Sequence, residues 1–241
     1  MQSGKVFEWM LVFLVLVLVC CPGCRQKASP NIVLIVVDDL GWKDLGCYGS
    51  NFYETPNIDN LASNGVRFTN AYSACPVCSP TRAALMTGKS PARVHFTGHI
   101  TAIGRHRYPE YGRIIPPEDL MHVPLKEVTI AEALKPAGYS TISIGKWHIG
   151  DQEKYYPTSQ GFDRNIAGYN HGSPPAYFYP YQDPEKEWNP EIPTLEGGSE
   201  GEYLTDRLTN EALKFIEDSG NRPFFLYLPY YAVHTPLQAP E

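Results

Sequence analysis

The sequence predicts an α/β domain built around a mostly parallel sheet that is sandwiched by helices. Three apolar runs rich in β-branched and aromatic residues, 31–37, 139–144 and 223–228, have the composition of buried strands. Helix-patterned segments separate these runs, and this alternation is typical of parallel sheets. The chain has 241 residues and a net charge of −6 without a basic patch, so nucleic-acid binding is disfavoured.

A leader precedes the first strand. Lys5 is followed by an apolar core at 10–19, which is shorter than the roughly 18 residues that a membrane span needs and fits a signal peptide. We therefore expect a signal peptide at 1–24 and an exported domain at 25–241. Cys24 also fits a bacterial lipoprotein leader, which would attach the protein to a membrane by a lipid, in the periplasm or at the cell surface.

The first strand ends in two adjacent carboxylates, Asp38 and Asp39. The carboxyl ends of strands are where α/β sheets bind ligands. Oxygen ligands favour Ca²⁺ or Mg²⁺ over zinc. The alternative is that one carboxylate merely caps the next turn. Neither aspartate is expected to have much of a packing role.

The following elements lead to a second helix. A short helix is expected at 55–62, and the alternating segment 66–72 indicates a strand. Ser79 is expected to be the N-cap of the second helix, with Pro80 at its first position. Gly88 is expected to end it.

Cys78 is therefore expected where the N–H groups and the positive dipole end of that helix converge, which is a natural anion site. Arg82, one turn on, can fold back to the same spot. A buried inert cysteine is one alternative, and Cys75 completes a C-x-x-C that could be a redox pair or half a zinc site. Zinc needs four ligands, however, and Cys47 is the only other cysteine after the leader. The spacing to the arginine excludes a thiol phosphatase, and a disulfide between Cys47 and Cys75 stays open.

Three more polar residues follow strands. A helix capped by Thr129 and the second strand lead to Lys146 and His148, which point to the same side because they are two residues apart. An amphipathic helix at 203–218 and the third strand lead to His234. Taken singly, these residues would be a solvated lysine and hydrogen-bonded histidines.

In this order, the segments resemble the type I sulfatase family, which has an alkaline phosphatase-like fold. The signature Cys-x-Pro-x-Arg stands at 78–82, with its Thr-Gly at 87–88. Gly-Lys-Trp-His-x-Gly stands at 145–150 and His-x-Pro at 234–236. The resemblance covers nearly all of the chain after the leader.

The resemblance implies a catalytic group of Cys78, Arg82 and His148. A maturation enzyme would oxidise Cys78 to Cα-formylglycine, whose hydrated aldehyde attacks sulfur. Arg82 would orient this group, and His148 would take a proton from it. Lys146 and His234 would bind the substrate, on its sulfate and on its leaving oxygen.

The resemblance also implies a metal ion held by Asp38, Asp39 and the modified Cys78, with Ca²⁺ favoured over Mg²⁺. The substrate would be a sulfate ester on a sulfated saccharide. One alternative is a phosphodiesterase or phosphonate monoester hydrolase of the same superfamily. Another is an inactive exported fragment.

The segment 151–201 changes in character and is rich in Tyr, Pro, Gly and Trp. It is either an ordered loop whose aromatic side chains pack on the body or a substrate rim on which sugar rings stack. Gly161-Phe162-Asp163 resembles the family's Gly-Phe-Asp, although the residues after it depart from the pattern. Other rim candidates are His95, His99, Arg105 and His106.

Members of the family are much longer than this chain. Their remaining part carries further metal ligands, a second sulfate-binding lysine and a smaller subdomain. We therefore expect a chain truncated before the C-terminal subdomain, with an incomplete calcium site.

Overall fold

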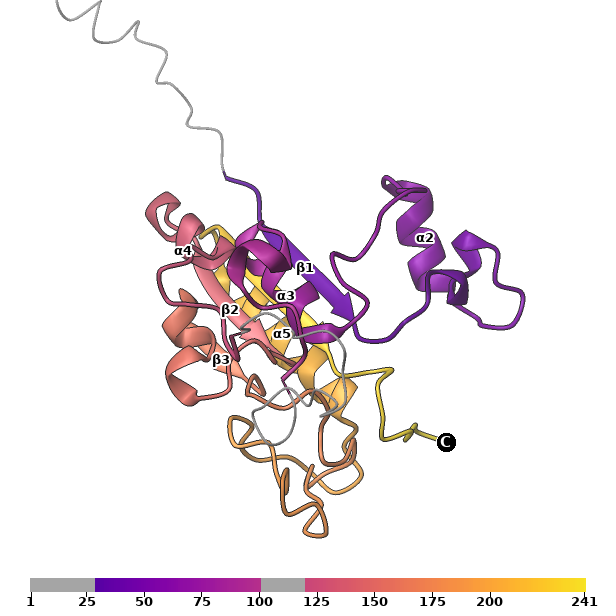
Figure 1. Cartoon of the computed structure of the whole chain (residues 1–241). Helices are drawn as coiled ribbons and strands as arrows, with labels where there is room; N and C mark the ends of the chain where they lie inside the picture. Colours follow the sequence, from indigo (N-terminus) through magenta and orange to yellow (C-terminus); the bar gives the residue numbers. More distant parts are fainter. Residues whose placement is uncertain (1–28, 101–119) are drawn as a thin grey trace, which may run out of the picture. The chain divides into compact units, whose positions relative to one another are not determined.

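The computed structural model describes residues 29–100 and 120–241, and the described residues from Asn31 onward form one compact unit. Within the described residues, four parallel strands form one sheet in the order β1-β4-β2-β3 (Figure 1). They are β1 (Ile32–Val37), β2 (Ser140–Ile144), β3 (Arg164–Ile166) and β4 (Phe224–Tyr230). The three strands predicted from the apolar runs are confirmed. The predicted leader at 1–24 lies outside the described residues.

Within residues 29–100 and 120–241, four α-helices and several short 3₁₀ helices accompany the sheet. The α-helices are α2 (Pro56–Asn64), α3 (Cys78–Thr87), α4 (Ile130–Leu134) and α5 (Leu204–Ser219). The 3₁₀ helices are η1 (Trp42–Asp44), η2 (Gly46–Tyr48), η3 (Pro91–Val94), η4 (Lys135–Ala137), η5 (Glu153–Tyr155) and η6 (Pro157–Gln160). Across 29–100 and 120–241, none of the helices has the length and apolar character to cross a membrane.

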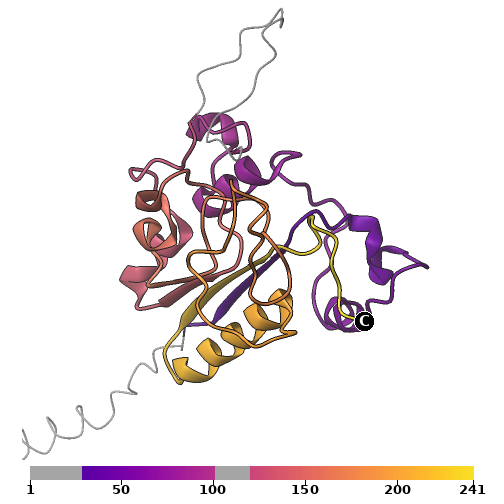
Figure 2. The same ribbon diagram turned by 90° about the horizontal axis from the view of Figure 1, so that it is seen from below.

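Helices cover both faces of the sheet, as the sequence predicts (Figure 2). Successive side chains of a strand point to opposite faces. Leu226 on β4 therefore packs with Leu208 and Phe215 of the amphipathic helix α5. Its neighbour Tyr227 points the other way, into a second cluster that includes Met86 of α3.

The strand β1 departs from the prediction that it is buried on both faces. It lies at the edge of the described sheet and pairs with β4 alone. Leu34 packs in the same cluster as α3, but Val33 and Ile35 on the opposite face are 47% and 53% exposed. The physical reason is that α5 packs on β4 and β2, one and two strands away from the edge.

The strand predicted at 66–72 is wrong. The segment has no regular secondary structure, and Val66, Phe68 and Tyr72 are exposed. Alternation of side chains makes a strand only where a neighbouring strand supplies backbone partners. Here the carbonyl of Phe68 instead accepts a hydrogen bond from the Tyr48 hydroxyl, at 2.8 Å.

The start of α3 also differs from the prediction. The helix begins at Cys78, with Val77 in the N-cap position, and the Ser79 hydroxyl accepts the N–H of Ile100 at 3.1 Å. Pro80 still lies in the first turn, where its missing N–H costs nothing. Gly88 ends the helix as predicted, with a φ of 64° that favours glycine. Thr129 caps α4 as predicted, since its hydroxyl accepts a backbone N–H of the first turn.

The segment 151–201 contributes to the body of the domain. It contains β3, which pairs with β2 at the far edge of the sheet. Tyr169, Tyr177 and Tyr181 are buried in the core cluster beside α5, whereas Trp188 is 49% exposed. Most of its tyrosine surface therefore packs on the body rather than facing solvent.

Candidate active site

The site forms where β1, β2 and β4 end side by side. The register pairs Val37 at the end of β1 with Tyr230 of β4. Backbone hydrogen bonds continue beyond the strands, from Asp38 N–H to the carbonyl of Ala232 at 3.0 Å and from Lys146 N–H to that of Pro229 at 2.8 Å. Because parallel strands end at one edge, polar residues far apart in sequence meet there.

Asp38 is the centre of a buried charge cluster. Its Oδ1 lies 3.0 Å from Arg82 Nη2, and its Oδ2 forms an ion pair with Lys146 Nζ. Asp38 is 6% exposed, Arg82 2% and Lys146 0%, so the expectation that neither aspartate has much of a packing role is wrong for Asp38. Two cations against one carboxylate leave a net positive centre, and removing the carboxylate would leave two buried cations uncompensated.

The two cations differ in their surroundings. Arg82 Nη1 donates to the carbonyl of Lys146 at 2.7 Å and lies 3.5 Å from the Tyr227 hydroxyl. Burial opposes its charge, but Tyr227 and Asp38 outweigh burial and raise the pKa of Arg82. Burial and the nearby Arg82 lower the pKa of Lys146, against the pull of Asp38. Arg82 therefore holds its proton more firmly than Lys146 does.

Cys78 and His148 are in direct contact, with 3.2 Å between Sγ and Nδ1. The other ring nitrogen, Nε2, lies 2.9 Å from the carbonyl oxygen of Ile100. A carbonyl can only accept, so Nε2 carries the hydrogen and the Nδ1 lone pair faces Cys78. Burial and the nearby Lys146 lower the pKa of His148 well below its ordinary value, so the ring is a neutral acceptor.

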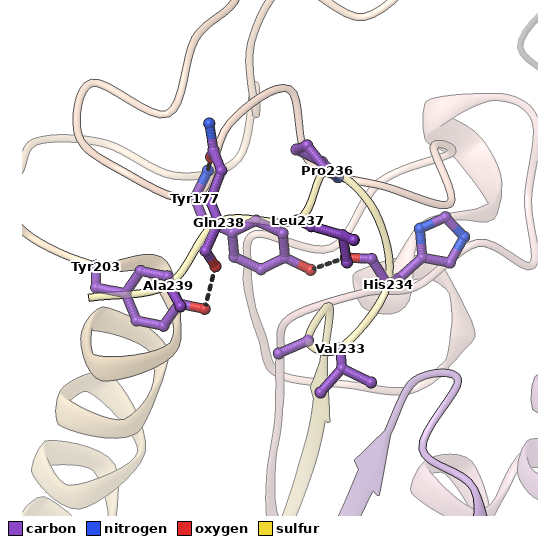
Figure 3. A pocket seen from close by; sticks show the side chains of 9 residues that line it. Tyr177, Tyr203, Val233, His234, Pro236, Leu237, Gln238 and Ala239 are labelled. Carbon is purple, nitrogen blue, oxygen red and sulfur yellow. Dashed lines mark hydrogen bonds between the residues drawn. The ribbon is translucent and has the colours of Figure 1, made fainter. Parts of the chain in front are cut away.

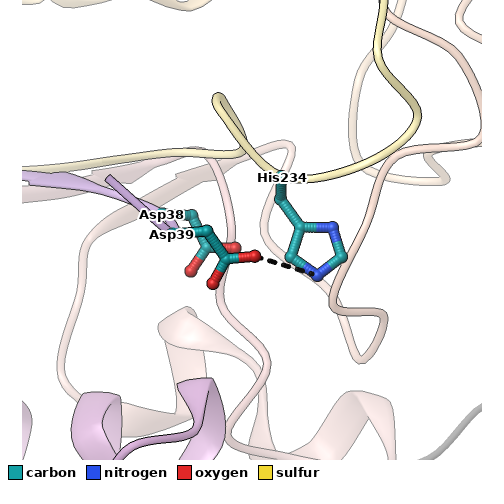
Figure 4. A group of neighbouring side chains, drawn as sticks. All are labelled: Asp38, Asp39 and His234. Carbon is teal, nitrogen blue, oxygen red and sulfur yellow. Dashed lines mark ion pairs between the residues drawn. The ribbon is translucent and has the colours of Figure 1, made fainter. Parts of the chain in front are cut away.

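Asp39 and His234 form the open side of the site (Figure 4). Asp39 is 64% exposed, and its Oδ2 lies 3.7 Å from His234 Nε2. One ligand atom from each of Asp38, Asp39 and His234 can be chosen so that all lie within 4.8 Å of one another. A carboxylate has about four lone-pair positions, so Asp38 can keep its two ion pairs and still face a cation. The two carboxylates supply the oxygen donors that a hard divalent cation prefers.

A cavity of about 300 Å³ joins these groups. It lies between the end of β1 and the start of α3. Its lining includes Asp38, Asp39, Cys78, Thr81 and Arg82. Together with the contacts of Lys146, His148 and His234, the structure brings all seven predicted site residues into one place.

The other residues predicted to line the substrate rim are His95, His99, Arg105 and His106. His99 lies near enough to His148 to contribute to lowering its pKa. His95 is exposed, and Arg105 and His106 lie outside the described residues. Cys47 and Cys75 are free thiols, so the disulfide that the sequence left open is not formed.

Sequence reasoning missed the groups that hold the site in place. The Tyr177 hydroxyl donates to the carbonyl of His234 at 2.9 Å (Figure 3). The backbone N–H of Tyr177 donates to Gln238 Oε1 at 2.7 Å. The Tyr203 hydroxyl donates to the carbonyl of Gln238 at 3.0 Å. No motif marks these tyrosines. Tyr227 could have been found, because it lies on the α3 face of a predicted strand.

Comparison with known proteins identifies close relatives. Residues 30–241 match the family model described as Sulfatase. An N-acetylgalactosamine-6-sulfatase of Canis lupus familiaris is 39% identical over 227 residues, which are 87% of this chain and 41% of the relative. Arylsulfatase G of Rattus norvegicus is 33% identical over 245 residues, which are 89% of this chain and 43% of that protein. The chain spans about two fifths of the length of these relatives.

Solved structures give the same result. The crystal structure of Ps i-CgsB aligns with a TM-score of 0.68 and 38% identity, over 88% of this chain and 47% of that one. The same protein is also known in complex with k-i-k-neocarrahexaose. BT4656, in complex with its substrate D-glucosamine-2-N,6-O-disulfate, aligns at 0.60 with 27% identity, over 85% of this chain and 35% of that one. These likenesses confirm the predicted fold class.

Proposed function

Because this chain belongs to the sulfatase family, we propose that the residues around Cys78 form a centre that hydrolyses sulfate esters. The observation that carries the proposal is the 3.2 Å contact of Cys78 with a neutral His148 beside the buried Asp38–Arg82–Lys146 cluster. A nucleophile position, a base and a net positive centre are the parts that transfer of an anionic group needs.

His148 acts as the base. Its Nδ1 lone pair faces position 78, and the bond from Nε2–H to the Ile100 carbonyl prevents the ring from presenting the wrong nitrogen. A ring whose pKa is lowered by burial stays ready to accept a proton at neutral pH. When it has accepted that proton, the ring carries a positive charge beside the departing anion.

Lys146 would bind the sulfate oxygens, and Arg82, which lines the cavity beside Cys78, would orient position 78 through its charge. Arg82 donates one N–H from each Nη atom, to the Lys146 carbonyl and to Asp38. Lys146 has three N–H donors and gives one to Asp38, so two remain for an anion. His234, on the open side, would hold the leaving oxygen and protonate it.

Two groups would complete the chemistry. Formylglycine, made from Cys78 by a maturation enzyme, would supply as its hydrate two hydroxyls on one carbon, one to attack sulfur and one to be deprotonated for sulfate release. Ca²⁺ held by Asp38, Asp39 and position 78 would supply positive charge. Ca²⁺ is favoured over Mg²⁺ because an irregular set of oxygen ligands suits its flexible coordination.

The proposed substrate is a sulfated saccharide. Ps i-CgsB has been solved with k-i-k-neocarrahexaose, and BT4656 has been solved with D-glucosamine-2-N,6-O-disulfate. Trp188, which is half exposed, offers an aromatic face of the kind on which sugar rings stack.

The test is a side-by-side assay of sulfate and phosphate esters, with the protein produced beside a formylglycine-forming enzyme. Conversion of Cys78 is read as a loss of about 18 Da in the peptide that contains it. We expect converted protein to cleave sulfate monoesters and a Cys78→Ala variant not to. Faster cleavage of phosphodiesters or phosphonates would assign the alternative activity. Full conversion without turnover of either class would mean that this chain is an inactive fragment.

We also propose that the protein is exported and anchored by a lipid on Cys24. This rests on the leader at 1–24, which lies outside the described residues. A Cys24→Ala variant should move from the membrane fraction to the soluble exported fraction. An unchanged distribution would contradict the anchor while leaving export in place.

A further inference from the structure

The ring of His148 rests directly on the backbone of Gly172. A Cβ atom at position 172 would lie 2.5 Å from Cε1, 2.8 Å from Nδ1 and 3.1 Å from Nε2 of that ring. Real Cβ atoms do not approach other atoms as closely as the first two distances. Gly172 does not have a positive φ, so its lack of a side chain is needed for space and not for backbone conformation.

The ring cannot easily move out of the way of such an atom. On its other sides, Nδ1 contacts Cys78 Sγ at 3.2 Å and Nε2 contacts the Ile100 carbonyl at 2.9 Å. The backbone N–H of His148 donates to the Tyr169 carbonyl at 3.0 Å. A displaced ring would therefore lose one of its two polar contacts.

The backbone at Gly172 is also held. The Tyr169 hydroxyl donates to Asn189 Oδ1 at 2.9 Å, and Asn189 Nδ2 donates to the carbonyl of Ser173 at 2.9 Å. Asn189 is buried, so it ties the residues on both sides of Gly172 to one fixed point. If a side chain at position 172 clashed with the His148 ring, the ring would be displaced more than the backbone.

We propose that Gly172 is a positioning residue for His148. Its bare backbone lets the imidazole lie where Nδ1 meets position 78, and any side chain there would turn the base away. The segment 151–201, which the sequence offered as either packing or rim, would thus set the geometry of the base. This inference rests on the proposed function in one respect, which is that His148 acts as the base for position 78.

The test measures the reactivity of the unconverted Cys78 thiol, so it needs neither formylglycine nor sulfate turnover. The rate of alkylation of Cys78 by iodoacetamide at fixed pH is read by peptide mass spectrometry, with Cys47 as internal reference. Four proteins are compared: wild type, Gly172→Ala, His148→Ala and the double variant. Losing the thiol–imidazole hydrogen bond should slow alkylation about fivefold in Gly172→Ala. In the His148→Ala background, Gly172→Ala should have no further effect.

Ser173→Ala is the matched control. Only its backbone carbonyl takes part in this network, as the acceptor of the Asn189 side-chain amide, so the alkylation rate should equal that of wild type. An equal slowing by Gly172→Ala in both backgrounds would overturn the proposal, as would a wild-type rate in Gly172→Ala.

Folding gives a second way to test the proposal if Gly172→Ala does not fold. Removing the ring of His148 makes room for the new methyl group, so the double variant should then regain the folded state. If the double variant also fails to fold, Gly172 serves something other than His148, and the proposal is wrong. A sulfate ester assay that fails while the alkylation results hold would count against the proposed function alone.

Discussion

The two sides of the site are built differently. On the buried side, Asp38, Arg82, Lys146 and His148 are almost fully enclosed, and each has short contacts with other protein groups. On the open side, Asp39 is largely exposed and its interaction with His234 is long, at 3.7 Å. Adjacent residues of one motif thus have separate physical roles. The contacts of the buried side are complete without a ligand. On the open side, the carboxylate of Asp39 is free to bind a cation.

The largest effect is expected from breaking the buried side at Asp38. Asp38→Asn leaves Arg82 and Lys146 buried without their carboxylate, and loss of one partner from such a cluster costs about 3–5 kcal/mol. Unfolding in guanidinium chloride measures this cost. A loss no greater than that of Asp39→Asn would show that the two aspartates are equivalent and contradict the comparison.

The second effect is a pH dependence of stability that comes from His148. Burial and Lys146 lower its folded pKa below the ordinary value of 6.5, so between these two values the unfolded chain binds a proton that the native chain does not. The free energy of unfolding should therefore fall as the pH drops below 6.5, by up to about 1.4 kcal/mol per pH unit, and this contribution is complete above 6.5.

His148→Gln should reduce that slope, and the remainder should come from His122 and His171, because burial also lowers the pKa of each of these histidines. The exposed His95 is the matched control, and His95→Gln should leave the slope in place. If His148→Gln keeps the wild-type profile, another group is responsible for the acid sensitivity.

The third effect concerns how the open side is held. Tyr177→Phe removes the hydrogen bond to the carbonyl of His234 and should cost about 1 kcal/mol, because the carbonyl loses a buried donor. Amide hydrogen exchange should rise in the turn at 232–238. Tyr203→Phe, which removes an exposed bond to Gln238, should have a smaller effect on both measurements. Equal effects would mean that Tyr177 has no special role in placing His234.

The smallest effect on stability is expected at Asp39. Asp39→Asn should change the free energy of unfolding by less than about 0.5 kcal/mol, as exposed substitutions usually do. Calcium binding should nevertheless weaken, because the substitution removes the most accessible carboxylate of the site. Calorimetric titration with Ca²⁺ and with Mg²⁺ measures this. Unchanged Ca²⁺ affinity would remove Asp39 from the ligand set.

Local patterns were sufficient wherever a feature depended on neighbours in the chain. The apolar run at 31–37, the cap at Thr129 and the end of α3 at Gly88 were all predicted, because strand composition and helix ends are properties of a few adjacent residues. The alternating segment 66–72 failed for the opposite reason. A strand needs a partner from elsewhere, and the described sheet supplies none there.

The sequence by itself determined which chemical groups the site contains. Asp38, Asp39, Cys78, Arg82, Lys146, His148 and His234 each follow a strand or open a helix, and parallel strands must bring such positions to one edge. Only the tertiary structure decided that Asp38 is buried and Asp39 exposed, which nitrogen of His148 faces Cys78, and that Gly172 and Tyr177 support the site. Burial and ring orientation depend on contacts between residues far apart in the chain, and no local pattern encodes these contacts.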